Sequence, residues 1–320
     1  MKKVLYLLAV AGILFGFASC NKDKKIDVDY NVTVELDANN VIGRYTPLWA
    51  GAFDFDDGEL LRLQLFVYDD HGSIVNNYEK IVSYYTTKAS FSLNIPEGNY
   101  IFIACSSVIS KRNGNYVDVW TYSLTDNINS FRADLNMDYY FFDKALLGLK
   151  MIEKKIDCGE SFIINIESAS ALVRERWTSV HYWNDVVQYV LYANDIFGAQ
   201  TDGHEFIYPE QTSINPVSQI RPYLYTANNI VGHTAYLPNH NFKYDLVAFT
   251  DSLVIPMTSG TFNINGGKQY DMIIDIPNMD IVINDVVSIP TDNASRKEDS
   301  SIRVLDLVVD NPNLFESLEY

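Results

Sequence analysis

Alternation of apolar and polar residues with a period of two dominates the chain. In residues 61–68, LRLQLFVY, the leucines share one face while Arg62 and Gln64 lie on the other. Residues 90–95, SFSLNI, and 161–168, SFIINIES, repeat the pattern, which is typical of strands with one buried face. Helical periodicity is sparse. The pattern therefore predicts a protein built almost entirely from β-strands.

Short polar motifs mark where these strands turn. The motif DDHG at 69–72 follows one strand, and PEG at 96–98 and NGG at 265–267 each stand between two strands. Glycine and proline favour tight turns, and so short a connection favours antiparallel neighbours. We therefore predict that residues 90–95 pair with residues 99–108, and that NGG closes a second hairpin.

Further strands are predicted from the same alternation, at 28–36, 116–124, 168–177, 186–194, 244–249, 260–265, 269–276, 280–285 and 301–309. Residues 127–151 are less regular, and their pattern fits a helical turn or a strand. Residues 198–241 carry four prolines and three glycines and are predicted to be mostly loops. A chain of 320 residues suits two domains better than one. The economical architecture is two antiparallel β-sandwiches in tandem, with a boundary at the polar joint near Asp157.

The first nineteen residues have the order of a secretory signal. Lys2 and Lys3 precede an apolar run, residues 4–17, which ends in small residues. The run is short for a membrane span, which needs roughly 20 apolar residues. The quartet FASC at 17–20 resembles a bacterial lipobox, in which Cys20 carries a diacylglycerol on its sulfur. This lipid is the only cofactor that we expect.

The resulting division of the chain is a signal peptide at 1–19, a lipidated leash at 20–27, an N-terminal sandwich at 28–156 and a C-terminal sandwich at 157–320. Position 21 is Asn, not the Asp that marks inner-membrane retention in many Gram-negative lipoproteins. The outer membrane is therefore the predicted location. Whether the protein faces the periplasm or the outside is left open.

Charge and cysteine content narrow the class of protein. The formal net charge is −17, and a strongly acidic chain without a basic stripe is not expected to bind nucleic acid. With Cys20 lipidated, Cys105 and Cys158 remain. The oxidising environment of an exported protein permits a disulfide between them. Cys105 lies in an apolar run, which supports a buried free thiol at least as well.

No group of residues carries a catalytic or metal-binding pattern. The acidic segment FDFDDGE at 53–59 lacks EF-hand spacing and is interpreted as a solvated turn. The histidines lack zinc-hydrolase spacing; they are His71, His181, His204, His233 and His240. The tryptophans are interpreted as core residues, although they can also line a sugar-binding face; they are Trp49, Trp120, Trp177 and Trp183. We therefore predict a structural or binding protein and no enzyme.

Three stretches resemble the FimB-type fimbrial anchor family. They are LRLQLFVYDDHGSIV at 61–75, SFSLNIPEGNYIFIACSS at 90–107 and SASALVRERW at 168–177. The first contains an acidic-glycine turn, and the second contains a Pro-x-Gly-x-Tyr corner. One departure is that Ala104, Cys105 and Ser106 stand where relatives often have a tryptophan.

The resemblance implies two transthyretin-like domains and a role at the base of a fimbrium assembled by strand exchange. A stalk subunit of such a fimbrium loses its first strand to a protease, and the C-terminal strand of a neighbour fills the groove. An anchor keeps its first strand, here residues 28–36. We expect other fimbrial subunits as partners. The candidate donor is residues 301–309, or else these residues pair within their own domain; its apolar members are Ile302, Val304, Leu305, Leu307 and Val309.

Two alternatives remain. Cleavage after Arg44 would remove the first strand with the lipid and make the protein a stalk or tip subunit. A surface lipoprotein that binds glycans for a polysaccharide uptake system is the rival from a different class.

Overall fold

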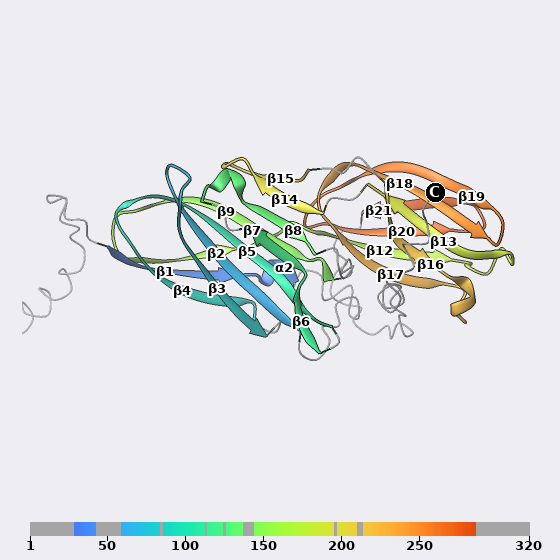
Figure 1. Ribbon diagram of the computed structural model, residues 1–320, viewed down its shortest axis with the longest axis horizontal. Coiled ribbons are helices and arrows are strands. Elements are labelled where there is room, and N and C mark those ends of the chain that lie inside the picture. The colour runs from blue at the N-terminus through green and yellow to red at the C-terminus, as the bar shows by residue number, and fades with distance from the viewer. Residues whose placement is uncertain are drawn as a thin grey trace, which may run out of the picture.

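The computed structural model describes residues 29–42, 59–83, 86–112, 114–123, 126–136, 144–194, 197–209 and 214–285, and in these the chain forms two β-sandwiches placed end to end (Figure 1). The all-β prediction is confirmed. Helical structure in these ranges is short: α2 (Asn39–Ile42), η1 (Ile128–Ser130) and η4 (Pro222–Leu224). No helix in the described ranges is long and apolar enough to cross a membrane.

The first sandwich has a small sheet and a large sheet. The small sheet has the order β10-β1-β4, with β1 at Tyr30–Asp37, β4 at Lys88–Ile95 and β10 at Glu160–Asn165. The large sheet has the order β11-β9-β5-β2-β3, and β6 also pairs with β5. Its strands are β2 (Leu60–Asp69), β3 (Ile74–Ser83), β5 (Gly98–Arg112), β6 (Asn115–Asp118), β9 (Leu147–Ile156) and β11 (Glu167–Ser168).

The second sandwich consists of two four-stranded sheets. One has the order β17-β12-β20-β21, and the other β16-β13-β18-β19. The strands of the first are β12 (Ala171–Thr178), β17 (Ile230–Tyr236), β20 (Gln269–Asp275) and β21 (Asp280–Asp285). Those of the second are β13 (Val186–Ala193), β16 (Asn215–Ile220), β18 (Asn239–Thr250) and β19 (Val254–Ile264). Most pairs are antiparallel, but β1 with β10 and β12 with β20 are parallel.

A fifth sheet connects the two sandwiches. Its order is β15-β14-β8-β7, with β7 at Trp120–Ser123, β8 at Arg132–Leu135, β14 at Gly198–Thr201 and β15 at Phe206–Ile207. Strands β14 and β15 belong to the connection between β13 and β16 of the second sandwich. We call residues 197–209 the clasp, because this segment reaches back and pairs with the first sandwich.

The clasp corrects the prediction that residues 198–241 are mostly loops. This range contains β14, β15, β16, β17 and the start of β18. The first two strands are only four and two residues long, too short for an alternating pattern to stand out. Strand β15 pairs with β14, and β14 pairs with β8, which is more than 60 residues earlier in the chain. Only the folded chain brings β14 and β8 together.

Both predicted hairpins at PEG and NGG are wrong. Strand β4 pairs with β1, whereas β5 pairs with β2 and β9. Likewise β19 pairs with β18, whereas β20 pairs with β12 and β21. Each turn carries the chain from one sheet to the facing sheet. A sandwich corner and a hairpin need the same turn residues, and so local chemistry could not distinguish them. The turn at DDHG does close a hairpin, between β2 and β3.

Two other segments differ in detail from their predictions. Residues 116–124, predicted as one strand, divide at Val119 into β6 and β7, which join different sheets. The undecided range 127–151 contains η1, β8 and the start of β9.

The strand pairings also bear on the division into domains. Strand β10 pairs with β1, and β11 pairs with β9, so residues 160–168 join the sheets of the first sandwich. The boundary drawn at residue 157 from sequence assigns them to the second domain. We propose a boundary between Ser168 and Ala171 on this basis.

Candidate functional site

The first strand lies inside its sheet, with a neighbour on each side. Strand β1 pairs with β4 in the antiparallel sense from Tyr30↔Ile95 to Asp37↔Lys88. It pairs with β10 in the parallel sense from Val32↔Glu160 to Asp37↔Asn165. A strand paired on both edges satisfies its own backbone donors and acceptors, and it satisfies those on the facing edges of its two neighbours.

Side-chain burial explains why β1 occupies this position. Val32, Val34 and Leu36 are completely buried in the first core. A buried side chain of this kind contributes about 1.5–3 kcal/mol, so the three together contribute roughly 5–9 kcal/mol. On the opposite face, Lys88 Nζ lies 3.2 Å from Glu35 Oε1 and 3.1 Å from Asp37 Oδ2. Removing β1 would leave an apolar groove between two unpaired strand edges.

The residues predicted to attach the protein, to be cleaved, or to donate a strand lie outside the described residues. They are Cys20, Arg44, Ile302, Val304, Leu305, Leu307 and Val309. The sequence places Cys20 ten positions before Tyr30, the first residue of β1. The attachment point and the central strand are thus separated by a short segment of chain.

The disulfide considered between Cys105 and Cys158 is not formed. Cys105 is a free thiol, completely buried in β5, and burial raises the pKa of the Cys105 thiol well above its ordinary value. Cys158 follows the end of β9, where Ile156 pairs with Gly98. Cys105 lies seven positions after Gly98 in the same extended strand, about 23 Å away at roughly 3.3 Å per residue. A disulfide needs Cα atoms within about 7 Å.

The acidic segment 53–59 contains a residue that sequence reasoning misjudged. Glu59 is buried rather than solvated. Its Oε2 lies 2.7 Å from Lys144 Nζ, and its Oε1 accepts a hydrogen bond of 2.8 Å from Ser110 Oγ. Both side chains of the ion pair are only 1% exposed. The other acidic residues of the segment lie outside the described residues.

A second buried carboxylate lies in the other sandwich. Glu175 in β12 accepts hydrogen bonds at Oε1 from Thr234 Oγ1, at 2.8 Å, and from Tyr236 Oη, at 3.2 Å. Burial raises the pKa of the Glu175 carboxyl, because removal from water penalises its charged form. On the other face of the same sheet, Asp271 accepts hydrogen bonds from Arg174 and Arg176. Burial opposes ionisation of Asp271 as well, but the two arginines outweigh it and lower its pKa.

The histidines are spread over separate elements. His71 lies in the β2–β3 turn, where it contacts Asp70, and Asp69 is close by. Asp69 Oδ1 accepts hydrogen bonds from the backbone N–H groups of His71 and Ser73, so this carboxylate closes the turn. The other four lie in the β12–β13 loop, the β14–β15 turn, β17 and β18; they are His181, His204, His233 and His240.

The tryptophans are mainly core residues, as predicted. Trp120 and Trp177 are buried, and Trp183 packs against the second core. Trp49 lies outside the described residues. The most exposed aromatic residues in the described ranges, which sequence reasoning missed, are Tyr182 and Tyr223 in connections of the second sandwich, at 61% and 65% exposure.

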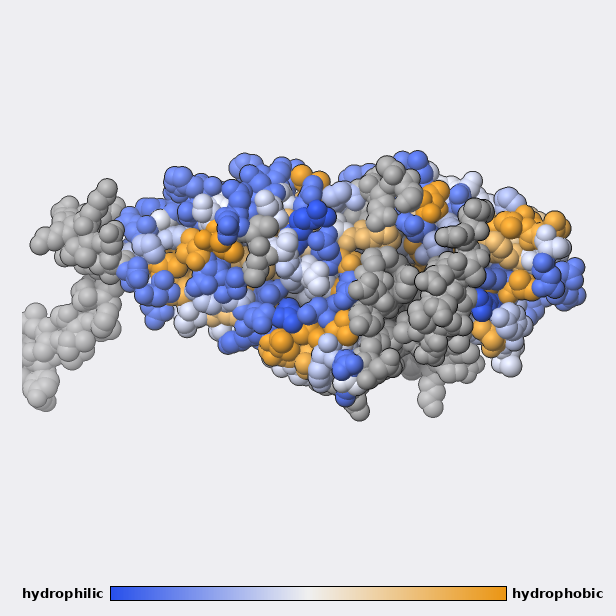
Figure 2. Space-filling model, viewed as in Figure 1, coloured by the Kyte–Doolittle hydropathy of each residue, from blue (hydrophilic) through white to orange (hydrophobic). Residues whose placement is uncertain are grey.

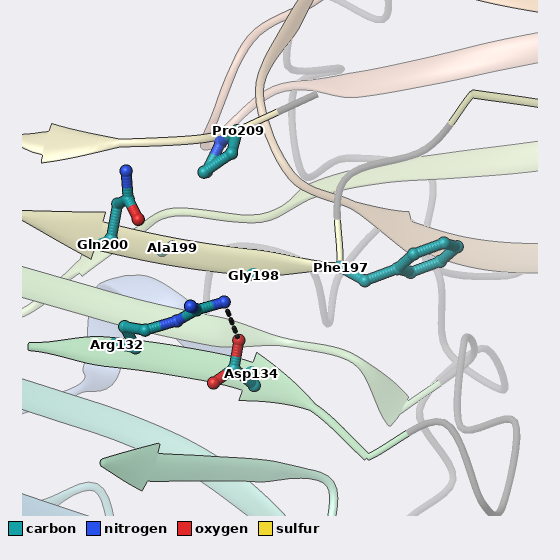
Figure 3. Close-up of a pocket in the computed structure, with 7 residues that line it drawn as sticks. All are labelled: Arg132, Asp134, Phe197, Gly198, Ala199, Gln200 and Pro209. Carbon is teal, nitrogen blue, oxygen red and sulfur yellow. Dashed lines mark hydrogen bonds and ion pairs between the residues drawn. The ribbon is translucent and has the colours of Figure 1, made fainter. Parts of the chain in front are cut away.

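A surface pocket of about 250 Å³ lies where the clasp pairs with the first sandwich (Figure 3). Arg132 and Asp134 from β8 form an ion pair of 3.2 Å, and Gln200 from β14 also lines the pocket. The Phe197 ring points away from this polar group. Of the residues that the structure describes, those lining the pocket include no histidine, cysteine or serine, and they offer hydrogen-bonding groups.

Comparisons with known proteins concern the fold. No protein-family model matches the chain, and no curated protein matches it. Among solved structures, it is similar to a proposed polysaccharide-binding protein from Bacteroides thetaiotaomicron, with a TM-score of 0.51 and 13% identity over 80% of this chain and 96% of that chain.

The chain is also similar to a proposed adhesin from the same organism, with a TM-score of 0.49 and 10% identity over 82% of this chain and 98% of that one. A third similar structure is the tip fimbrial protein Mfa3 from Porphyromonas gingivalis, with a TM-score of 0.44 and 11% identity over 81% of this chain and 98% of that chain. At 13% identity, the first of these similarities shows that the fold is shared.

Proposed function

We propose that the protein is an outer-membrane lipoprotein that serves as a fimbrial anchor or accessory subunit and has no enzymatic activity. The observation that carries the proposal is the position of β1, which already fills its own groove and pairs with β4 and β10. An anchor needs this arrangement, because the chain that bears the lipid must stay joined to the folded body.

The direction of β1 also suits a tether. A pull on the N-terminal leash acts along the strand axis and loads the hydrogen bonds to both neighbours together rather than one after another. The apolar face of Val32, Val34 and Leu36 adds resistance, since sliding by one residue would turn these side chains out of the core. Acyl chains on Cys20 would supply the membrane end, and stable anchoring needs two or more such chains.

Attachment to the membrane is tested by replacing the proposed lipid site. We expect Cys20→Ser to release the protein from membranes after high-salt and carbonate washing, and to abolish incorporation of labelled fatty acid. Cys158→Ser is the matched control, because it removes a different thiol of the mature chain. Membrane retention of Cys20→Ser equal to that of the control would refute the lipid anchor.

Joining to other subunits is proposed to occur by strand addition, with residues 301–309 as the donor. An open sheet edge presents unpaired backbone groups that an added strand satisfies. A chain truncated after Ser300 should remain in the membrane but should no longer co-purify with fimbrial subunits. Undiminished co-purification would contradict the donor role. A mature protein that begins at Tyr45 would instead indicate a stalk or tip subunit.

The glycan-binding alternative has two supports. Tyr182 and Tyr223 are exposed, and a neighbour in fold is described as polysaccharide-binding. This alternative predicts that the purified protein is retarded in gels containing a surface polysaccharide and that replacement of both tyrosines removes the retardation. The anchor predicts no such retardation.

A further inference from the structure

The second sandwich has a free end formed by four connections. Strands β12, β16, β18 and β20 all run away from the first sandwich, and the connections that follow them are residues 179–185, 221–229, 251–253 and 276–279. This distal end lies opposite β1, at the far side of the molecule (Figure 1). If the N-terminus is held at a membrane, the distal end is the part that projects furthest from it.

Large apolar side chains are exposed in or beside three of the four connections at this distal end. We define the distal cluster as Tyr182, Tyr223, Leu224, Leu253 and Val254. Leu253 is 63% exposed, comparable with the two tyrosines. Figure 2 shows apolar surface at this end of the second sandwich. Soluble monomers rarely gather large exposed apolar side chains, and such patches commonly mark contact sites.

Hydrogen bonds hold two of the four connections in fixed positions. The Asn228 side chain accepts from the His181 backbone N–H, and the Asn229 side chain accepts from the Ser179 backbone N–H, each at 3.1 Å. The Asn228 carbonyl also accepts from the Val180 N–H. The loops that carry Tyr182 and Tyr223 are therefore tied together, and an ordered surface loses less entropy on binding.

The charges around the cluster are mostly negative. Asp185 and Asp251 lie in the connections, and Asp280 begins the strand after the last of them; all three are exposed. In the described residues of the four connections, Arg221 is the one lysine or arginine. Such a surface complements an apolar patch bordered by lysine or arginine, and it disfavours an anionic membrane or an acidic polysaccharide.

We propose that the distal cluster is a second docking surface, on which a fimbrial subunit places an apolar patch bordered by basic side chains. The inference rests on the fimbrial role proposed above. Three of the five side chains are aliphatic, which suits a protein surface better than the faces of sugar rings. Fifteen residues separate Asp285, the end of β21, from Ser301. When extended they span at most about 50 Å, so the donor can reach a subunit seated at the distal end.

The test measures binding of the full mature lipoprotein, in detergent, to fimbriae isolated from cells that lack it. We expect Tyr223→Ser with Leu253→Ser to weaken binding at least tenfold, because anchors at the centre of an interface carry most of its affinity. The matched control is Tyr116→Ser with Ile163→Ser, which removes side chains of similar exposure, 54% and 55%, from the first sandwich. The control should bind within about twofold of the unmodified chain.

Charge provides a second, independent variant. Asp185→Lys with Asp251→Lys should weaken binding severalfold in low salt and less in 0.5 M salt, because screening suppresses electrostatic steering. Unchanged melting temperatures would show that each variant is folded.

The outcomes separate the two proposals. If the unmodified chain does not bind fimbriae, the fimbrial role and the docking surface are both refuted. If it binds and the distal variants bind equally well, only the docking surface is refuted. If the distal variants lose affinity for the purified capsular polysaccharide of the same cells but keep their affinity for fimbriae, the cluster is a glycan site and the present assignment is wrong.

Discussion

At the scale of single residues, strict alternation in β12 places a carboxylate in the core. Val173, Glu175 and Trp177 occupy every second position and are all buried. Turning Glu175 outward would require turning its two apolar neighbours outward as well, since the strand has a period of two. Thr234 and Tyr236 on β17 supply the donors that make this burial tolerable. The alternation of residues 173, 175 and 177 in the sequence therefore already indicated that Glu175 lies on the buried face of the strand.

The raised pKa of Glu175 predicts a pH-dependent stability. Its ordinary pKa is about 4.5, so the folded state binds the proton more tightly than the unfolded state. The free energy of unfolding therefore falls as the pH rises from about 4.5 to the folded pKa, and it then levels off. Glu175→Gln removes this titration. Between pH 4.5 and the folded pKa, the unfolding free energy of the variant should therefore rise relative to that of the unmodified chain. Urea unfolding at several pH values measures this difference.

A suitable control for this experiment is Glu97→Gln, which removes an exposed carboxyl at the PEG turn. Its free energy of unfolding should stay within about 0.5 kcal/mol of that of the unmodified chain. If the difference in unfolding free energy between Glu175→Gln and the unmodified chain stays constant with pH, the raised pKa assigned to the buried Glu175 carboxyl is wrong.

At the scale of elements, β1 is the strand on which the proposed attachment depends. Its register with β4 and β10 sends Val34 into the core and leaves Asn31 exposed. The same added charge should therefore have very different effects at these two positions of one strand.

We expect Val34→Asp to lower the free energy of unfolding by at least about 3 kcal/mol, because it buries a charge without a partner and removes a packed side chain. Asn31→Asp should change it by less than about 0.5 kcal/mol. Urea unfolding measures both values, and limited proteolysis should cut Val34→Asp first near β1. Equal stabilities of the two variants would mean that β1 is not inserted as described.

At the scale of the whole molecule, the clasp makes the two sandwiches depend on each other. Ala199 is buried in the first core, and Phe197, Phe206 and Tyr208 pack against it. The rings of Phe206 and Phe131 meet at a centroid distance of 6.2 Å. A pull transmitted from one sandwich to the other can therefore pass through the clasp as well as through the direct connection between β11 and β12.

Phe206→Ala should loosen the clasp, whereas Ile207→Ala, on the opposite face of β15 and 39% exposed, should not. We expect Phe206→Ala to cost about 1–3 kcal/mol of local stability, less than for a fully buried ring, because Phe206 is only partly buried. Amide hydrogen exchange should become faster in β8 and β14, while β12 and β18 keep their protection. Unchanged exchange in β8 would show that the clasp does not stabilise the first sandwich.

The sequence alone determined the all-β class and the position of most long strands. Alternation every second residue directly reflects the two faces of a strand, as in β2 and β4 with their buried leucines and phenylalanine. The sequence also contains the quartet FASC at 17–20, the basis for predicting a lipid at Cys20. This lipid remains a prediction.

The tertiary structure decided which strands are neighbours. The chain does change direction at PEG and NGG, as the residues there predicted. Strand pairing, however, is a contact between segments distant in the chain, and β4 pairs with β1 rather than with β5. The clasp, the buried pair of Glu59 and Lys144, and the distal cluster arise in the same way. Each joins residues that no local pattern connects, because long-range packing selects among turns and strands that are locally equivalent.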